Sequence, residues 1–269
     1  MGKHTWILGN VFISIKQIQL VSMPYRENTH ARQELHDIVV ADVALMFAFS
    51  LVLSGGVFML FSSPRSFFTL LLLYLPISAV AVSLSFVLHE LMHKFVAQYY
   101  GAIAGFRTSY NGLVITLLTG AFGFLFGVPG ATMIYASSFS RKENGLVSLA
   151  GPLTNVAIFA VFVAVFYAIN HGAVSIASQI ISPTSYVNLL IAYTVFISLW
   201  LAFFNMLPIP PLDGSKVMAW NMMAYIAMIA MVIGLLFFTG IIPEIIPLTA
   251  LIFVLFIAVF FSFSYRSFL

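Results

Sequence analysis

Long hydrophobic runs separated by short polar stretches dominate the chain. A helix that crosses a bilayer needs about 20 residues, and six of the runs are long enough. We predict helices at residues 37–61, 67–100, 145–170, 186–207, 215–239 and 244–265. A seventh run, 112–128, is apolar but contains Gly120, Gly123 and Gly127 and ends in the turn sequence VPG. The pattern predicts an all-α integral membrane protein with about six transmembrane helices and one irregular segment.

Composition supports this fold class. The 269 residues are 62% hydrophobic and only 7% charged, and a soluble domain of this size could not bury so much apolar surface. There is no cysteine, which excludes disulfides and thiolate ligands, so any bound metal must be held by His, Asp or Glu. The sequence has no basic stripe or aromatic-basic module, and nucleic acid is not an expected partner.

The distribution of Lys and Arg indicates whether residues 112–128 cross the membrane or return to the side from which they enter. Lys and Arg near span ends concentrate on the cytoplasmic side of a membrane. If residues 112–128 enter and return on the same side, a cytoplasmic N terminus places ten of the eleven Lys and Arg inside and only Arg65 outside. If the segment crosses fully, the count becomes six against five. The re-entrant path is favoured, and such a segment should line a cavity in which its backbone is satisfied.

The N-terminal residues 1–36 are expected to be a cytoplasmic or interfacial segment. Its apolar stretch is short and contains Lys16, and the alternation in FISIKQIQL suggests a surface strand. Asp37 and Asp42 stand at the predicted start of the first span, where acids cap helices and complement the helix dipole.

The sequence HELMH, residues 89–93, places three ionisable groups in an apolar span. Residues four apart share a helix face, so His89 and His93 can direct two imidazole nitrogens at one point. This is the spacing of zinc ligands, and the intervening Glu90 can reach a zinc-bound water as general base. Unpartnered ionisable groups in a span are costly and usually mark a functional site.

A hydrolytic zinc site normally has three protein ligands and one open position. The remaining acid at membrane depth is Asp213 in FFNMLPIPPLDGSKV, where Pro208, Pro210 and Pro211 break the preceding helix. Asp213 is the predicted third ligand. The alternative role for Asp213 is a helix cap or turn residue, since Asp-Gly is a common turn pair.

These residues resemble the site-2 protease family of intramembrane zinc metalloproteases. The resemblance rests on HELMH, on SLAGPLTN at residues 148–155, and on the pattern N-x-x-P-x-P-x-L-D-G from Asn205 to Gly214, and it covers about residues 67–216. It implies a catalytic core over 67–216 within a polytopic membrane protease domain, 37–269, with zinc near the cytoplasmic side. Short forms lack the PDZ and CBS modules of many relatives, and neither module is found here.

The family also implies residues that bind substrate. Members carry a membrane-embedded β element after the HExxH span, and a re-entrant β-hairpin-like segment at about 112–138 matches its position. The stretch ATMIY after VPG could be its edge strand, which would place Ala131, Thr132, Met133 and Ile134 against an unwound substrate. Asn205 would hold substrate backbone or the developing oxyanion; a hydrogen bond between helices is its alternative role.

The expected function is therefore intramembrane proteolysis. His89, His93 and Asp213 would bind Zn2+, Glu90 would act as general base, and the partners would be a membrane-spanning protein substrate and the lipid bilayer. An alternative is a metal-ion transporter or channel using the same cluster, although this leaves Glu90 unexplained and the paired repeats of many transporters are not evident. An inactive relative and a prenyl-protein zinc protease are weaker alternatives, the latter because its third ligand is a downstream Glu.

Overall fold

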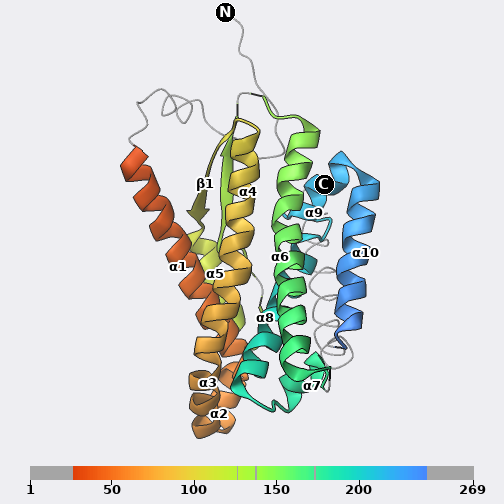
Figure 1. The fold of residues 1–269 in the computed structure, drawn as a ribbon. Helices are drawn as coiled ribbons and strands as arrows, with labels where there is room; N and C mark the ends of the chain where they lie inside the picture. The colour runs from red at the N-terminus through yellow and green to blue at the C-terminus, as the bar shows by residue number, and fades with distance from the viewer. Residues whose placement is uncertain (1–26, 126, 137, 173, 241–269) are drawn as a thin grey trace, which may run out of the picture.

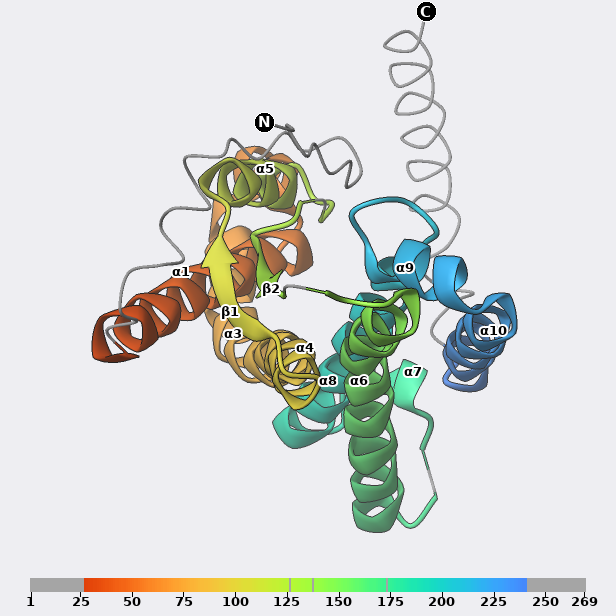
Figure 2. The ribbon, with the colours of Figure 1, turned by 90° about the horizontal axis from the view of Figure 1, so that it is seen from above.

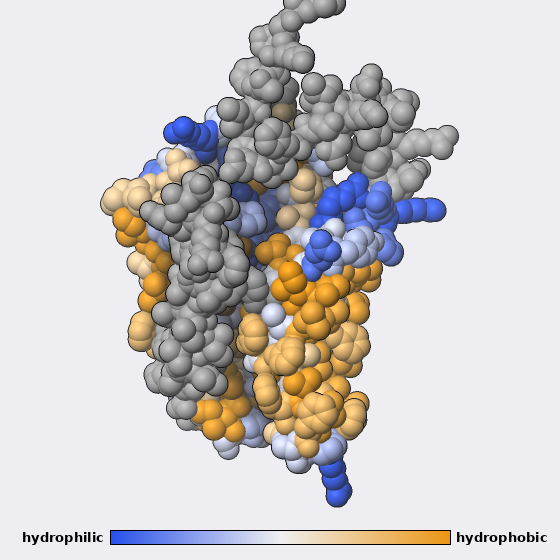
Figure 3. All heavy atoms as spheres, turned by 180° about the vertical axis from the view of Figure 1, so that it is seen from behind, coloured by the Kyte–Doolittle hydropathy of each residue, from blue (hydrophilic) through white to orange (hydrophobic). Residues whose placement is uncertain are grey.

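The computed structural model describes residues 27–240 except 126, 137 and 173, and this part of the chain is mostly helical. Four of its helices are long and apolar enough to cross a membrane, at Ala31–Leu53, Pro64–Tyr99, Arg141–Asn170 and Tyr186–Asn205. Figure 1 shows that they form an elongated bundle along one common direction. On the face drawn in Figure 3, hydrophobic side chains form a broad band with hydrophilic residues gathered at its ends. These features are those of a multi-pass membrane protein.

The first helix, α1 (Glu27–Leu53), is followed by the short α2 (Gly56–Ser62). The predicted helix 37–61 is interrupted where Gly55 adopts φ 83°, a left-handed conformation that suits glycine. It also begins ten residues earlier than expected. Asp37 and Asp42 therefore lie inside α1 rather than at its start, and the prediction that they cap the helix is wrong. Asp37 accepts a hydrogen bond from Arg107 (3.3 Å), and Asp42 accepts one from the Ser83 hydroxyl (2.6 Å).

The second span runs through α3 (Pro64–Val82), a π-helical turn η2 (Ser83–Val87) and α4 (Leu88–Tyr99). This agrees with the prediction for residues 67–100. A π turn inserts one extra residue into the helical repeat and is frequent at functional sites. Here it ends at Val87, and only Leu88 separates it from the HELMH sequence. The Ser85 hydroxyl in this turn lies 2.7 Å from the Ser198 hydroxyl of α8 (Tyr186–Asn205).

A two-stranded antiparallel sheet follows α4. Strand β1 (Ile103–Thr108) pairs with β2 (Gly130–Tyr135), and α5 (Tyr110–Ala121) lies between them in the sequence. β2 contains the predicted strand ATMIY. The predicted hairpin-like segment, 112–138, is corrected in two respects: its first half is the helix α5, and the strand that pairs with β2 precedes it. α5 packs closely against α1, where a Cβ on Gly120 would lie 2.9 Å from the Cα of Ala48.

The central part of the bundle is formed by α6 (Arg141–Asn170) and α8 (Tyr186–Asn205). The short helix α7 (Ile176–Ile181) connects them in the sequence. α6 begins with a capping box in which Ser140 and Glu143 satisfy each other's backbone N–H groups. α8 is the most buried of the four candidate spans, and its Ala192, Val195 and Leu199 join a hydrophobic cluster with Phe166 of α6. These two helices position the part of the chain that follows.

The predicted helix 215–239 is divided into α9 (Asp213–Trp220) and α10 (Met222–Phe238). The break occurs at Asn221, whose backbone is extended (φ −150°, ψ 108°) and whose side chain accepts hydrogen bonds from the N–H groups of Met223 and Ala224. In the view from above, α9 and α10 lie on the opposite side of α6 from the sheet (Figure 2). The predicted helix 244–265 and the predicted strand FISIKQIQL lie outside the described residues.

Candidate metal centre

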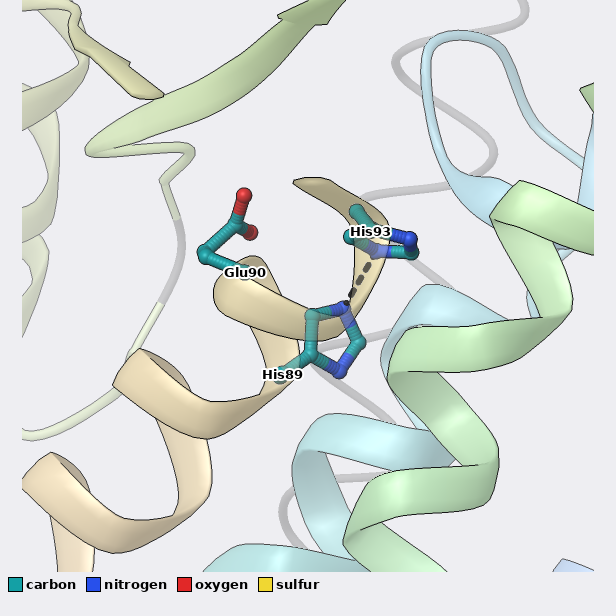
Figure 4. A group of neighbouring side chains, drawn as sticks. All are labelled: His89, Glu90 and His93. Atoms are coloured by element: carbon teal, nitrogen blue, oxygen red, sulfur yellow. Dashed lines mark hydrogen bonds between the residues drawn. The ribbon is translucent and has the colours of Figure 1, made fainter. Parts of the chain in front are cut away.

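The helix α4 presents His89 and His93 on one buried face. His89 is 3% exposed and His93 is 7% exposed, while Leu88, Met92 and Phe95 on other sides of the helix are exposed. Figure 4 shows both imidazoles projecting from adjacent turns with their nitrogens facing each other. Their Nε2 atoms are 3.0 Å apart. The spacing of four residues thus brings the two rings together, as predicted.

Asp213 joins this pair from a distant part of the sequence. Its Oδ2 atom lies 3.0 Å from Nε2 of His93 and 3.4 Å from Nε2 of His89, and the residue is 6% exposed. Asp213 is the first residue of α9, so it lies just after the proline-rich turn that ends α8. Gly214 is required there because a Cβ would collide with the carbonyl oxygen of Met206. The structure therefore brings together the three residues that the sequence predicted as ligands.

The three facing atoms fit a tetrahedral metal ion. Two ligand atoms bound at zinc distances in a tetrahedral site lie about 3.3–3.4 Å apart, close to the 3.0–3.4 Å observed. The backbone of α6 supports this fit, because Gly151 faces the same point. A Cβ on Gly151 would lie 2.5 Å from both Nε2 atoms. Glycine at this position leaves the space beside the ligands open.

The outer nitrogens of both imidazoles contact α6. His93 Nδ1 lies 2.7 Å from the carbonyl oxygen of Val147, which can only accept, so Nδ1 carries the proton and Nε2 is free to bind a metal. His89 Nδ1 lies 3.2 Å from Nδ2 of Asn155, and the buried Oδ1 of Asn155 has no hydrogen-bond partner. Turning this amide by 180° would let Oδ1 accept from Nδ1–H of His89 and leave Nε2 for the metal.

Glu90 points away from this cluster toward the sheet (Figure 4). Its Oε2 atom accepts hydrogen bonds from the backbone N–H (3.0 Å) and the hydroxyl (2.9 Å) of Thr132 in β2. A carboxylate oxygen of Glu90 also lies within 4.8 Å of the imidazole nitrogens, so Glu90 is a second candidate for the third ligand. Asp213 is the better candidate because it is closer to both rings and has no competing donor as near as Thr132. Glu90 is left beside the metal position rather than in it.

Asn205 is separate from the cluster in the described contacts. It is the last residue of α8, and its Nδ2 donates to the carbonyl oxygen of Leu201 one turn earlier (2.9 Å). This is a hydrogen bond within one helix, rather than the bond between helices considered as its alternative role. Of the four β2 residues predicted to contact substrate, Ala131 and Met133 are exposed, whereas Thr132 and Ile134 are half-buried.

Two features of the site escaped the sequence reasoning. Lys216 lies one turn after Asp213, with Nζ 3.5 Å from Oδ1, the carboxylate oxygen that faces away from the imidazoles. The i, i+3 spacing in DGSK could have revealed this pair. The contact between Glu90 and Thr132 had no comparable signal, because 42 residues separate them.

Comparisons with known proteins identify the family to which the chain belongs. The sequence profile of peptidase family M50 matches residues 168–241. The chain is 38% identical over 192 residues to the "Putative zinc metalloprotease MJ0611" of Methanocaldococcus jannaschii, a match that covers 71% of this chain and 86% of that protein. It is 28% identical over 160 residues to the "Putative zinc metalloprotease YwhC" of Bacillus subtilis, covering 54% and 71% of the two chains. No solved structure matches the chain significantly. The chain belongs to peptidase family M50, the site-2 protease family, and is a metalloprotease whose metal is zinc.

Proposed function

We propose that this protein is an intramembrane endopeptidase that hydrolyses peptide bonds within or near the transmembrane segments of other membrane proteins. In this proposal His89, His93 and Asp213 hold the zinc ion, and Glu90 is the general base. The observation that carries the proposal is the convergence of two Nε2 atoms and one Oδ2 atom within 3.0–3.4 Å, with Glu90 on the adjoining side of α4. A transport site has no need of this acid.

Each residue of the cluster has a distinct chemical task. When bound, zinc acts as a Lewis acid that polarises the peptide carbonyl, and it lowers the pKa of a bound water toward about 7. Glu90 takes the proton from the attacking water and later gives it to the leaving amine. The carbonyl oxygen of Val147 and the amide of Asn155 fix the orientation of the imidazoles, and Lys216 interacts with the second oxygen of Asp213.

Strand β2 is the proposed binding site for the cleaved segment. A helical substrate hides its peptide bonds, so it must be locally extended before water can attack. Addition of the extended segment to β2, along Ala131, Thr132, Met133 and Ile134, would satisfy its backbone groups in an apolar environment. β2 is suitably placed because Thr132 contacts Glu90 directly.

Asn205 is proposed to bind the substrate backbone or the developing oxyanion. Its position at the end of α8, before the turn that leads to Asp213, supports this role. Loss of one oxyanion donor typically reduces the rate by about 100- to 1,000-fold. Asn205→Ala should therefore lose most turnover and retain zinc, as measured by metal analysis of the purified variant. Loss of zinc in this variant would contradict the role.

We propose that the N terminus is cytoplasmic and that the catalytic core, about residues 67–216, has its zinc near the cytoplasmic side. The distribution of Lys and Arg along the sequence supports this orientation. A re-entrant path for the segment between the strands is supported by the sheet. Its ends are brought together where Ser109 N–H donates to the carbonyl oxygen of Pro129 (2.8 Å).

The test combines metal analysis with a cleavage assay. The purified protein is expected to bind one zinc ion per chain and to cut at least one member of a panel of single-span membrane proteins. Glu90→Gln should bind zinc and cut at least about 100-fold more slowly. Cleavage by Glu90→Gln at a rate close to that of the wild type would remove Glu90 from the mechanism. Zinc uptake into vesicles without cleavage would instead favour transport.

A further inference from the structure

The register of the sheet determines which backbone groups face outward. In an antiparallel pair, hydrogen-bonded and non-hydrogen-bonded residue pairs alternate. Ser109 N–H donates to the carbonyl oxygen of Pro129 just beyond the paired strands, so the pair formed by Phe106 and Thr132, three positions along the same register, is non-hydrogen-bonded. The N–H groups of Phe106 and Thr132 therefore point away from each other, one to each outer edge of the sheet.

The outer edge of β1 is closed by α1. Phe106 N–H donates to Oε1 of Glu34 (3.3 Å), and both oxygens of Glu34 accept hydrogen bonds from Nζ of Lys94 (2.7 and 2.8 Å). Farther along the strand, the Thr108 hydroxyl donates to the carbonyl oxygen of Asp37 (2.7 Å). An added strand would have to displace a helix and an ion pair here. Among the described residues, β2 is therefore the edge to which the proposed function adds the substrate strand.

At the β2 edge, the outward N–H of Thr132 is already bound by Glu90. The hydroxyl of Thr132 donates to the same Oε2 atom at 2.9 Å, and no salt bridge to Glu90 occurs among the described residues. The proposed general base thus occupies the position that the carbonyl oxygen of an added strand requires. One N–H group cannot make a full hydrogen bond to both acceptors.

We infer that Thr132 is a positioning residue that holds Glu90 at the sheet edge until a substrate strand displaces it. The inference rests on the proposed function. Pairing of the substrate with β2 transfers the N–H of Thr132 from Glu90 to the substrate carbonyl and frees Glu90 to face the water at the metal. The base is therefore released by the same event that extends the scissile segment. Substrate binding includes the cost of breaking the contacts between Glu90 and Thr132.

Thr132→Val and Thr132→Ser separate this role from simple support of the base. Valine is nearly isosteric with threonine and keeps the backbone N–H, but it removes the hydroxyl that holds Glu90; serine keeps that hydroxyl. With a substrate that the wild type cleaves, Thr132→Val should lower KM by about threefold to tenfold, the range of a net hydrogen bond, with little change in kcat. Thr132→Ser should keep the wild-type KM. A KM in Thr132→Val that is unchanged or higher would overturn the inference.

Binding to inactive variants provides a second readout that does not require turnover. Glu90→Ala removes the acceptor from the edge, whereas Glu90→Gln retains an amide oxygen that can still bind Thr132. With both zinc-loaded, Glu90→Ala should bind the same fluorescently labelled substrate more tightly than Glu90→Gln; equal or weaker binding would contradict the inference. Because the chain has no cysteine, Met133→Cys can be introduced into each variant as a single site to cross-link the substrate at β2.

Glu34→Gln is the matched control at the other edge. It weakens the acceptor for the N–H of Phe106 and should leave KM at the wild-type value, because no substrate is added there. A wild type that cleaves no membrane protein would refute the proposed function, and this inference with it. A wild type that cleaves while Thr132→Val shows no fall in KM would refute the inference alone.

Discussion

Two glutamates bind the two edges of one small sheet, and their neighbours give them different roles. Glu34 and Glu90 accept hydrogen bonds from the outward N–H groups of the facing residues Phe106 and Thr132. Glu34 is also ion-paired with Lys94, so it ties α1 to α4 and β1. Glu90 lies next to His89 and His93, and among the described residues its carboxylate accepts hydrogen bonds from Thr132. The same backbone contact thus joins a structural ion pair on the β1 side and the proposed general base on the β2 side.

The largest effect on zinc binding and cleavage is expected at Gly151 of α6, which faces the metal position beside Glu90. Gly151→Ala would place a Cβ 2.5 Å from both Nε2 atoms, within the space needed by the ion. The variant should bind no stoichiometric zinc and lose all measurable cleavage. Gly234→Ala is the control, because no atom of the described residues beyond its own helix backbone lies within 4 Å of the added Cβ. Normal zinc content in Gly151→Ala would show that the ion binds elsewhere.

The next largest effect on cleavage is expected from substituting each of the two glutamates with glutamine. Glu90→Gln should reduce cleavage by about 100- to 10,000-fold, the usual contribution of a general base, while zinc binding is retained. Glu34→Gln should leave the cleavage rate close to that of the wild type. The comparison is made with equal amounts of folded, zinc-loaded protein. Similar losses in both variants would mean that the two edges do not differ in function.

A smaller effect is expected from the residue that orients His89. Asn155→Ala should weaken zinc affinity by about 10- to 100-fold, as is typical when a partner of a ligating imidazole is removed. Competition with a chelator measures this change without reference to activity. Asn170→Ala, on the same helix, loses its mutual hydrogen bonds with Asn188 and should keep the wild-type zinc affinity. Equal affinities for wild type and Asn155→Ala would exclude this role.

The smallest effect concerns stability on the β1 side. The side chains of Glu34 and Lys94 are only 14% and 23% exposed, so removing one charge leaves the other partly buried without its partner. Glu34→Gln should reduce the free energy of unfolding by about 1–3 kcal/mol, with Glu90→Gln less affected. Thermal unfolding in detergent measures which of the two variants loses more stability. A greater loss in Glu90→Gln would reverse the assignment of roles to the two edges.

The residues proposed to carry the chemistry were predictable because they are rare in their surroundings. Polar ligands in an apolar span stand out, and the helical repeat alone places His89 and His93 on one face. The prolines before Asp213 indicated a turn, and the structure shows that this turn directs Asp213 to the imidazoles. The strand ATMIY was expected from the resemblance to the family, which places a β element after the HExxH span.

The remaining features depend on contacts between distant segments or on properties that hydropathy does not measure. β1 was not predicted, since its residues IAGFRT carry no clear alternation and become a strand by pairing with β2. The start of α1 was misplaced because residues 27–36 are polar, and hydropathy detects membrane burial rather than helix formation. The break at Asn221 lies in an apolar sequence, WNMMAY, where one extended residue leaves no hydropathy signal.

The ligand set of the zinc ion tests the central claim most directly. X-ray absorption at the zinc edge of the loaded wild type and of Asp213→Ala would identify the bound atoms. The account predicts one zinc ion per chain with two imidazole nitrogens and further oxygen ligands at about 2.0–2.2 Å, and weaker binding with one fewer protein oxygen in Asp213→Ala. A wild-type spectrum without imidazole scattering, or an identical site in Asp213→Ala, would contradict it.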